Sequence, residues 1–175
     1  MKKLSLYIFL VLMFFSINNL KANELFGIRL GDNIDNYKII DKSTDNSVRI
    51  DPPLPNENFW RYLIYFLDDG TIYMIIAANK EKFDNLTNCL SEMKIYFEIV
   101  EERLNKIATQ HHKWDKQKDP MLMILYKKKN SIDDFIYTFS VLCPNNEGNM
   151  ILEDFKLNVK SKKEQKDKLD KTGLQ

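Results

Sequence analysis

Two neighbouring segments that are apolar at almost every position constrain the fold of this chain most strongly. Residues 61–67 and 71–78 are rich in Tyr, Leu, Ile and Phe, and Asp68-Asp69-Gly70 separates them. Asp-Gly between two such runs is a strong signal for a β-hairpin, because both residues tolerate the positive φ of a tight turn. Turn geometry accounts for Asp68 and Asp69 more simply than a carboxylate pair for acid–base or metal chemistry.

A long amphipathic helix follows this hairpin. From Asp84 to about Thr109 the apolar residues recur every three or four positions, which is the period of a helix and not the two-residue period of a strand. The apolar stripe consists of Leu86, Leu90, Met93, Phe97, Val100, Leu104 and Ile107. At 1.5 Å per residue the helix is roughly 35 Å long, which is enough to cross one face of a sheet.

The other elements are shorter. A helix capped by Asp32 or Asn33 is expected through about residue 40, and residues 41–58, with three prolines, predict a long irregular connection. Further strands are expected over residues 25–30, 121–126, 135–143 and 150–159. This order predicts the α+β class: a mainly antiparallel sheet of about five to six strands, packed by one long amphipathic helix, plus a short N-terminal helix.

The first residues have the composition of a secretory signal peptide. Lys2 and Lys3 precede an apolar run, and Ala22 offers a small residue for cleavage. We expect residues 1–22 to be the signal, residues 23–159 a single α+β domain and residues 160–175 a charged, flexible tail. The protein is then exported to the periplasm or the cell exterior. Leu20 departs from the small-residue pattern of cleavage sites, so an uncleaved N-terminal membrane anchor stays open as the alternative.

The charge of the chain is nearly balanced. The 175 residues include 26 Lys and Arg and 25 Asp and Glu, and removal of residues 1–22 takes away three lysines and no acid. The mature chain is slightly acidic, with its excess lysines in the tail. Such a balance does not favour binding to nucleic acid, which requires a clustered positive surface.

The two cysteines are expected in one interface. Cys89 lies at the edge of the helical stripe, and Cys143 shares a strand face with Phe139 and Val141. In an oxidising compartment such a pair predicts a structural disulfide. Two separate buried thiols are the alternative. A nucleophilic cysteine is disfavoured because no histidine lies near either position in the sequence.

Candidate catalytic groups are few. The segment from His111 to Asp115 contains two adjacent histidines, which point about 100° apart on a helix and rarely bind one metal; at a helix end they complement the dipole. No phosphate-binding loop, nucleophile motif or HExxH sequence is present. We expect no catalytic residue, no metal site and no cofactor. A small hydrolase using Asp133, Asp134 or the histidine segment stays open.

The predicted sheet is unusual because both of its faces are apolar. One helix covers one face, so the other is either covered by the short helix and the Pro-rich loop or is a binding surface. The predicted contact surface consists of Leu63, Tyr65, Leu67, Tyr73 and Ile75, with residues 52–55 at its rim.

The function expected from this surface is that of a non-catalytic binding or interaction module. Its partner is another protein or a second copy of the chain, without nucleic acid, and with membrane contact only through an uncleaved signal segment. A small exported enzyme and a carrier of a small apolar ligand are the alternatives.

One short segment resembles known sequences. Phe26-Gly27-Ile28-Arg29-Leu30-Gly31-Asp32, directly after a signal peptide, is similar to the opening of many small exported bacterial proteins of unknown function. The resemblance covers about a dozen residues. It implies a bacterial envelope location and no particular activity.

Overall fold

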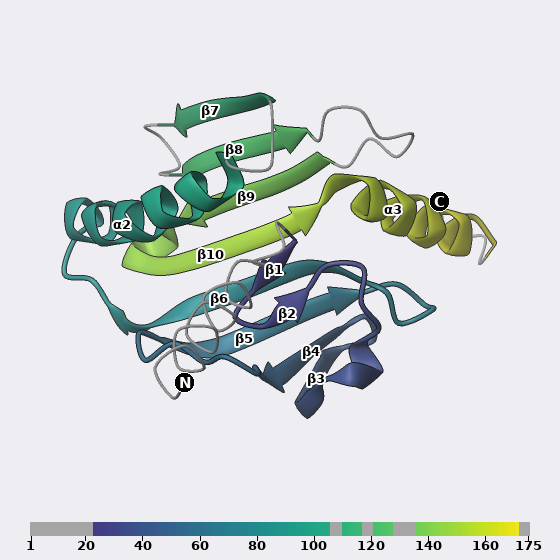
Figure 1. The fold of residues 1–175 in the computed structure, drawn as a ribbon. Coiled ribbons are helices and arrows are strands. Elements are labelled where there is room, and N and C mark those ends of the chain that lie inside the picture. Colours follow the sequence, from purple (N-terminus) through teal and green to yellow (C-terminus); the bar gives the residue numbers. More distant parts are fainter. Residues whose placement is uncertain (1–22, 106–109, 117–120, 128–135, 172–175) are drawn as a thin grey trace, which may run out of the picture.

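The computed structural model describes residues 23–105, 110–116, 121–127 and 136–171, which form an α+β fold (Figure 1). The predicted fold class is confirmed. The elements are β1 (Glu24–Leu25), β2 (Ile28–Arg29), the 3-10 turn η1 (Ile34–Asn36), β3 (Lys38–Thr44), β4 (Ser47–Asp51), β5 (Phe59–Phe66), β6 (Ile72–Lys82), α2 (Leu86–Asn105), β7 (Gln110–Lys116), β8 (Met121–Lys127), β9 (Ile136–Leu142), the 3-10 turn η2 (Pro144–Asn146), β10 (Glu147–Asp154) and α3 (Phe155–Lys171).

Eight strands form the main sheet, in the order β3-β4-β5-β6-β10-β9-β8-β7, and all neighbours are antiparallel. The hairpin of β5 and β6 turns at Gly70, whose φ is +83°, as the Asp-Gly signal predicts. β1 and β2 form a separate two-stranded hairpin. The sheet therefore exceeds the predicted five to six strands.

The additional strands lie where the sequence suggested other structure. Residues 41–58 were expected to be irregular, but β3 and β4 form a hairpin there, with Asp45 and Asn46 at its turn. The three prolines all follow β4 and therefore interrupt no pairing. The segment from His111 to Asp115 belongs to β7 rather than to a helix end, so the dipole argument for its histidines is wrong.

The expected N-terminal helix is a single 3-10 turn at Ile34–Asn36. The Asn33 side chain caps this turn by accepting a 2.9 Å hydrogen bond from the backbone N–H of Asp35, as the sequence predicted. The chain then continues as β3, because pairing with β4 supplies its backbone hydrogen bonds and Ile39 and Ile40 are β-branched.

One face of the sheet, which we call the core face, carries α2 and the β1–β2 hairpin (Figure 1). Cys89, Met93 and Phe97 of α2 are fully buried, and the Phe97 ring lies 6.0 Å from that of Phe139 on β9. The hairpin contributes Ile28, which is also fully buried. The amphipathic stripe predicted for the helix is therefore the surface that closes this core.

The predicted disulfide is confirmed. Cys89 near the start of α2 and Cys143 directly after β9 are bonded, with their Cα atoms 6.0 Å apart and both side chains buried. The bond joins the helix to the central strands of the sheet. It closes a loop of 54 residues in sequence separation.

The C-terminal residues differ most from expectation. The strand predicted over residues 150–159 ends at Asp154, and residues 155–171 form the helix α3, which includes most of the segment expected as a charged tail. Asp154 explains the change, because its side-chain oxygen accepts the backbone N–H groups of Lys156 and Leu157 and caps the new helix. Within the described ranges, no helix is long and apolar enough to cross a membrane.

Removal of the disulfide should destabilise the protein strongly. A double Cys89→Ala, Cys143→Ala variant is expected to lose about 4 kcal/mol of unfolding free energy, because the unfolded chain regains the entropy of a long loop. Urea unfolding, with and without a reducing agent, measures this loss. The agent should lower the wild-type midpoint and leave the double variant unchanged. Equal midpoints for the wild-type and double-variant proteins would show that the bond is dispensable.

Candidate functional site

The opposite face of the sheet, here called the second face, is only partly covered. Across the β5–β6 pair, Ile64 opposite Ile75 lies on the core face, and both are fully buried. Leu63 opposite Ile76 lies on the second face, and both remain partly exposed. Because side chains alternate between the faces of a strand, these pairs assign most neighbouring positions.

A β-bulge at Trp60 changes this alternation at the start of β5. Phe59 pairs with Asn79 and Arg61 with Ala78, so Trp60 is an extra residue. Phe59 packs into the core, 5.2 Å from the Tyr96 ring, whereas Trp60 is 55% exposed and lines the second face together with Arg61. Bulges commonly re-aim a side chain in this way.

A second bulge at Tyr73 acts similarly at the other end of the hairpin. Tyr65 pairs with Met74 and Phe66 with Ile72, which leaves Tyr73 as the extra residue. The Tyr73 ring lies 6.4 Å from that of Tyr65, and its hydroxyl group hydrogen-bonds with Ser161 of α3. Tyr73 therefore lies on the second face beneath α3.

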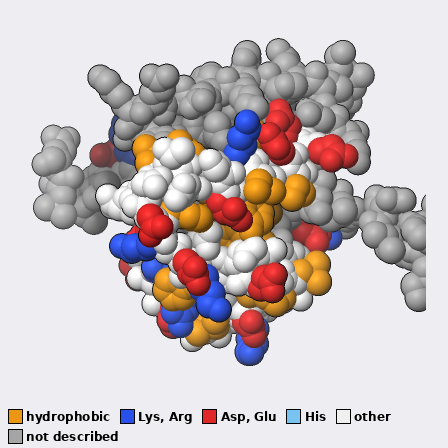
Figure 2. Space-filling model, turned by 90° about the vertical axis from the view of Figure 1, so that its left-hand side faces the viewer, with side chains coloured by type: hydrophobic (Ala, Val, Ile, Leu, Met, Phe, Trp, Pro, Cys, Tyr) orange, Lys and Arg blue, Asp and Glu red, His pale blue; other side chains and the backbone are white. Residues whose placement is uncertain are grey.

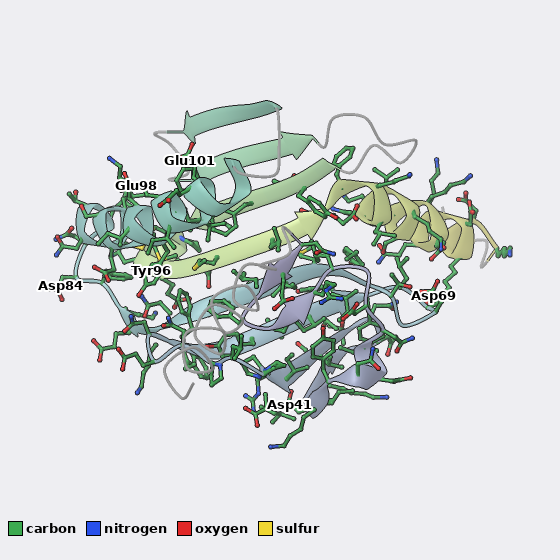
Figure 3. The ribbon with its side chains drawn as sticks, in the orientation of Figure 1. Asp41, Asp69, Asp84, Tyr96, Glu98 and Glu101 are labelled. Carbon is green, nitrogen blue, oxygen red and sulfur yellow. A yellow bond between two sulfur atoms is a disulfide. The ribbon has the colours of Figure 1, made fainter. Side chains whose placement is uncertain are left out.

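Helix α3 covers the end of the second face that lies near the β5–β6 turn. Ser161 is its buried contact, with 4% of its surface exposed. Two lysines bind the carboxylates of the turn: Lys168 lies 2.7 Å from Asp68, and Lys160 lies 3.7 Å from Asp69, which Figure 3 shows beside the helix. The turn residues thus add surface ion pairs to the packing of α3 on the sheet.

Two adjacent carboxyl groups precede α3: Asp154 is buried, and Glu153 is partly buried. Burial raises the pKa of Glu153 and of Asp154. For Asp154 this rise is opposed in part by the two backbone N–H groups that donate hydrogen bonds to its carboxylate. Burial also raises the pKa of the neighbouring Tyr137 to about 12. Within the described residues, Oε1 of Glu153 is buried without a hydrogen-bond partner. This corner stabilises the uncharged form of its acids.

Away from this turn, the second face contains a hollow of about 400 Å³, which we call the open groove. Its floor is apolar and crosses four strands: Leu63, Ile76, Ala78, Ile151 and Leu142. Trp60 and Arg61 line it on β5, and the ion pair of Lys82 with Glu147, 2.9 Å between charged atoms, lines it on β6 and β10.

The charges around this end of the molecule are mixed. Figure 2 views the side on which β6 leads into α2, and its acidic and basic side chains are interspersed with hydrophobic ones. Asp84 marks the same side in Figure 3. Among the described residues, no group of three or more His, Cys, Asp or Glu side chains is placed to hold a metal ion.

The predicted contact surface is divided by the structure. Leu63 lines the open groove, and Tyr65 lies partly buried on the same face. Leu67 and Tyr73 are buried, with 2% and 5% exposed. Ile75 is fully buried on the core face, so its assignment to the contact surface is wrong; the bulge at Tyr73 shifts the alternation that the sequence implied.

The Pro-rich loop does not form the rim of the second face. The backbone N–H of Leu54 donates to the carbonyl oxygen of Phe26, whose ring packs 5.1 Å from that of Tyr62 on the core face. The loop at residues 52–55 therefore adjoins the β1–β2 hairpin on the core side.

The side chains of the remaining candidates lie outside the described part of the structure. Asp133 and Asp134 lie outside the described residues, and for the segment from His111 to Asp115 only the strand is described. Trp60, Arg61 and Ile151 were not predicted as site residues. Alternation alone places Ile151 on a strand face, but no pattern in the sequence marks Trp60 as a bulge.

Comparison of the chain with protein-family models, with curated proteins and with solved structures finds no match.

The partly buried Glu153 should make stability depend on pH. Because its pKa is raised in the folded protein, its contribution is fully present below the pKa of the unfolded chain and is lost as pH rises through the folded pKa. A Glu153→Gln variant should therefore gain Tm relative to the wild type between pH 4 and pH 7, on the order of 2 °C because the group keeps some solvent contact.

Thermal unfolding of both proteins across this pH range measures the effect. Glu92→Gln, at an exposed position of α2, serves as the control and should follow the wild type. A constant difference between Glu153→Gln and the wild type at all pH values would contradict the raised pKa.

Proposed function

We propose that this chain is an exported, non-catalytic binding protein and that the open groove is its binding surface. The observation that carries the proposal is the partial cover of the second face. Helix α3 covers the apolar second face near the β5–β6 turn, and a hollow with an apolar floor lies farther along the same face.

The composition of the groove supports ligand binding. Removing the floor from water would stabilise a complex by roughly 25 cal/mol for each Å² of apolar surface buried. A volume of about 400 Å³ lies in the range of small-molecule sites, which combine an apolar lining with a few polar groups. Trp60 adds an exposed aromatic ring at the edge, a residue type that is common at binding surfaces.

The ligand favoured by these dimensions is a small molecule with an apolar body. The groove is open on one side and its floor is a rigid sheet, so binding requires little rearrangement. This role combines the predicted binding module with the predicted carrier of an apolar ligand. The protein-partner and self-association hypotheses then become alternative outcomes of the same experiment.

Export is the second part of the proposal. The disulfide between Cys89 and Cys143 supports it, because disulfides persist in oxidising compartments. The basic-apolar-small order of residues 1–22 supports it independently.

A neutral dye tests the groove. Nile red should bind the full chain with increased fluorescence, and Ile151→Glu should weaken its binding about tenfold, because a carboxylate then occupies the apolar floor. Ile95→Glu is the matched control: Ile95 is 53% exposed on the outer side of α2, so its replacement should leave dye binding within about twofold of the wild type.

A second variant separates binding from folding. Ala78→Phe should fill the hollow without adding charge and should also exclude the dye, while thermal unfolding monitors the fold of each variant. Equal dye binding by all variants would contradict the proposal. A dimer that Ile151→Glu dissociates would assign the groove to a second copy of the chain.

The exported form should be shorter than the translated chain. If cleavage follows Ala22, intact mass measurement of protein from the exported fraction should give a chain that begins at Asn23 and lacks two hydrogens at the disulfide. A Lys3→Glu, Lys2→Glu variant should accumulate with residues 1–22 attached, because the positive start of a signal is lost. Retention of these residues in exported wild-type protein would indicate an N-terminal anchor.

A further inference from the structure

We infer that the ligand of the open groove is a free, single-chain anionic amphiphile, with its apolar chain on the groove floor and its anionic head group at the Arg61 guanidinium. This inference rests on the proposed function and adds the chemical class of the ligand. It draws on the shape of the floor, on the position of Arg61 and on the pairing of the neighbouring cations.

The floor suits an extended chain. Leu63, Ile76, Ile151 and Leu142 come from β5, β6, β10 and β9, which are consecutive in the sheet. Neighbouring strands lie about 4.8 Å apart, so the floor extends across the strands for roughly 14 Å. Because these strands are already paired on both sides, their backbone groups offer the ligand few hydrogen bonds. The floor therefore favours an apolar chain over a polar one.

Arg61 supplies one cation beside this floor. It lies opposite Ala78 on the second face and is partly buried. The bulge at Trp60 places the indole and the guanidinium on the same face, at the β5 side of the groove. A ligand that crosses the floor from β9 therefore meets Arg61 at its β5 end.

Two neighbouring cations of this face have acidic partners, whereas Arg61 and Lys80, which both line the groove, have no acidic partner in the described part of the chain; of these two, Arg61 is partly buried and Lys80 is exposed. The Arg49 guanidinium lies 3.1 Å from Asp41, and Lys82 is paired with Glu147. No carboxylate of the described residues lies within ion-pair distance of Arg61. A partly buried charge beside apolar surface is stabilised by a counter-ion, and an arginine can bind a carboxylate through two parallel hydrogen bonds.

The surroundings disfavour other ligand charges. A cationic head group would be repelled by Arg61. A polyanion would be repelled by Glu81 and Glu147 at the groove and by the acidic side chains visible in Figure 2. A single anionic group at the end of an apolar chain satisfies both the floor and Arg61.

Displacement of Nile red by three amphiphiles of equal chain length tests the inference. Dodecanoate, dodecanol and dodecyltrimethylammonium are compared below the concentrations at which they form micelles. The wild type should bind dodecanoate about tenfold more tightly than dodecanol, as expected for one charge-assisted hydrogen-bonded pair, and the cation most weakly.

Arg61→Met should abolish this preference and leave the affinity for dodecanol within about twofold. Arg61→Lys should retain part of it, because the charge remains but the paired geometry is lost. Arg49→Met is the matched control: it removes a cation from the same face that already has a partner, and the preference should persist.

The outcomes separate this inference from the proposed function. If the dye binds in the groove but dodecanoate binds no more tightly than dodecanol, the anionic ligand class is wrong, and the groove is still the proposed binding surface. If Arg49→Met and Arg61→Met lose the preference for dodecanoate equally, the inference is also overturned, since general charge attraction would then explain that preference. If the dye does not bind in the groove at all, the proposed function itself fails.

Discussion

The packing of α2 against the core face is the interaction on which the rest of this structure depends. The helix buries Cys89, Met93 and Phe97 against β9 and β10, which follow it in the sequence, and the disulfide to Cys143 ties that contact to the sheet. Because the helix and the β1–β2 hairpin share this face, the apolar residues of the opposite face receive no cover from them. The existence of an open second face is thus a consequence of where the core forms.

Two single-residue bulges then determine what the second face presents. The bulge at Trp60 brings an indole and a guanidinium to one end of the β5–β6 hairpin, and the bulge at Tyr73 brings a phenol to the other. The phenol contacts α3 through Ser161, whereas Trp60 and Arg61 line the open groove. The same irregularity therefore serves packing at one end of the hairpin and, in our proposal, binding at the other.

Helix α3 covers the second face near the β5–β6 turn, and none of its described residues lines the open groove. Its position follows from the Asp154 cap, from buried Ser161 and from ion pairs to Asp68 and Asp69. These two aspartates carry the turn signal that the sequence shows, and the structure gives them a second use as partners of the helix. Surface ion pairs of this kind are individually weak, so burial of Tyr73 and Ser161 accounts for more of the docking than the charges do.

The sequence by itself determined the α+β class, the hairpin at Gly70, the long helix and the pairing of Cys89 with Cys143, because each depends on local turn chemistry or on the period of apolar residues. It also indicated a sheet that is apolar on both faces. Only the tertiary structure decided that Ile75 faces the core, that the C-terminal residues form a docked helix and that Arg61 stands beside an open floor. A bulge shifts the alternation of side chains between the two sheet faces by one residue, and it has no distinctive local sequence pattern. The docking of α3 depends on partners almost a hundred residues away in the chain.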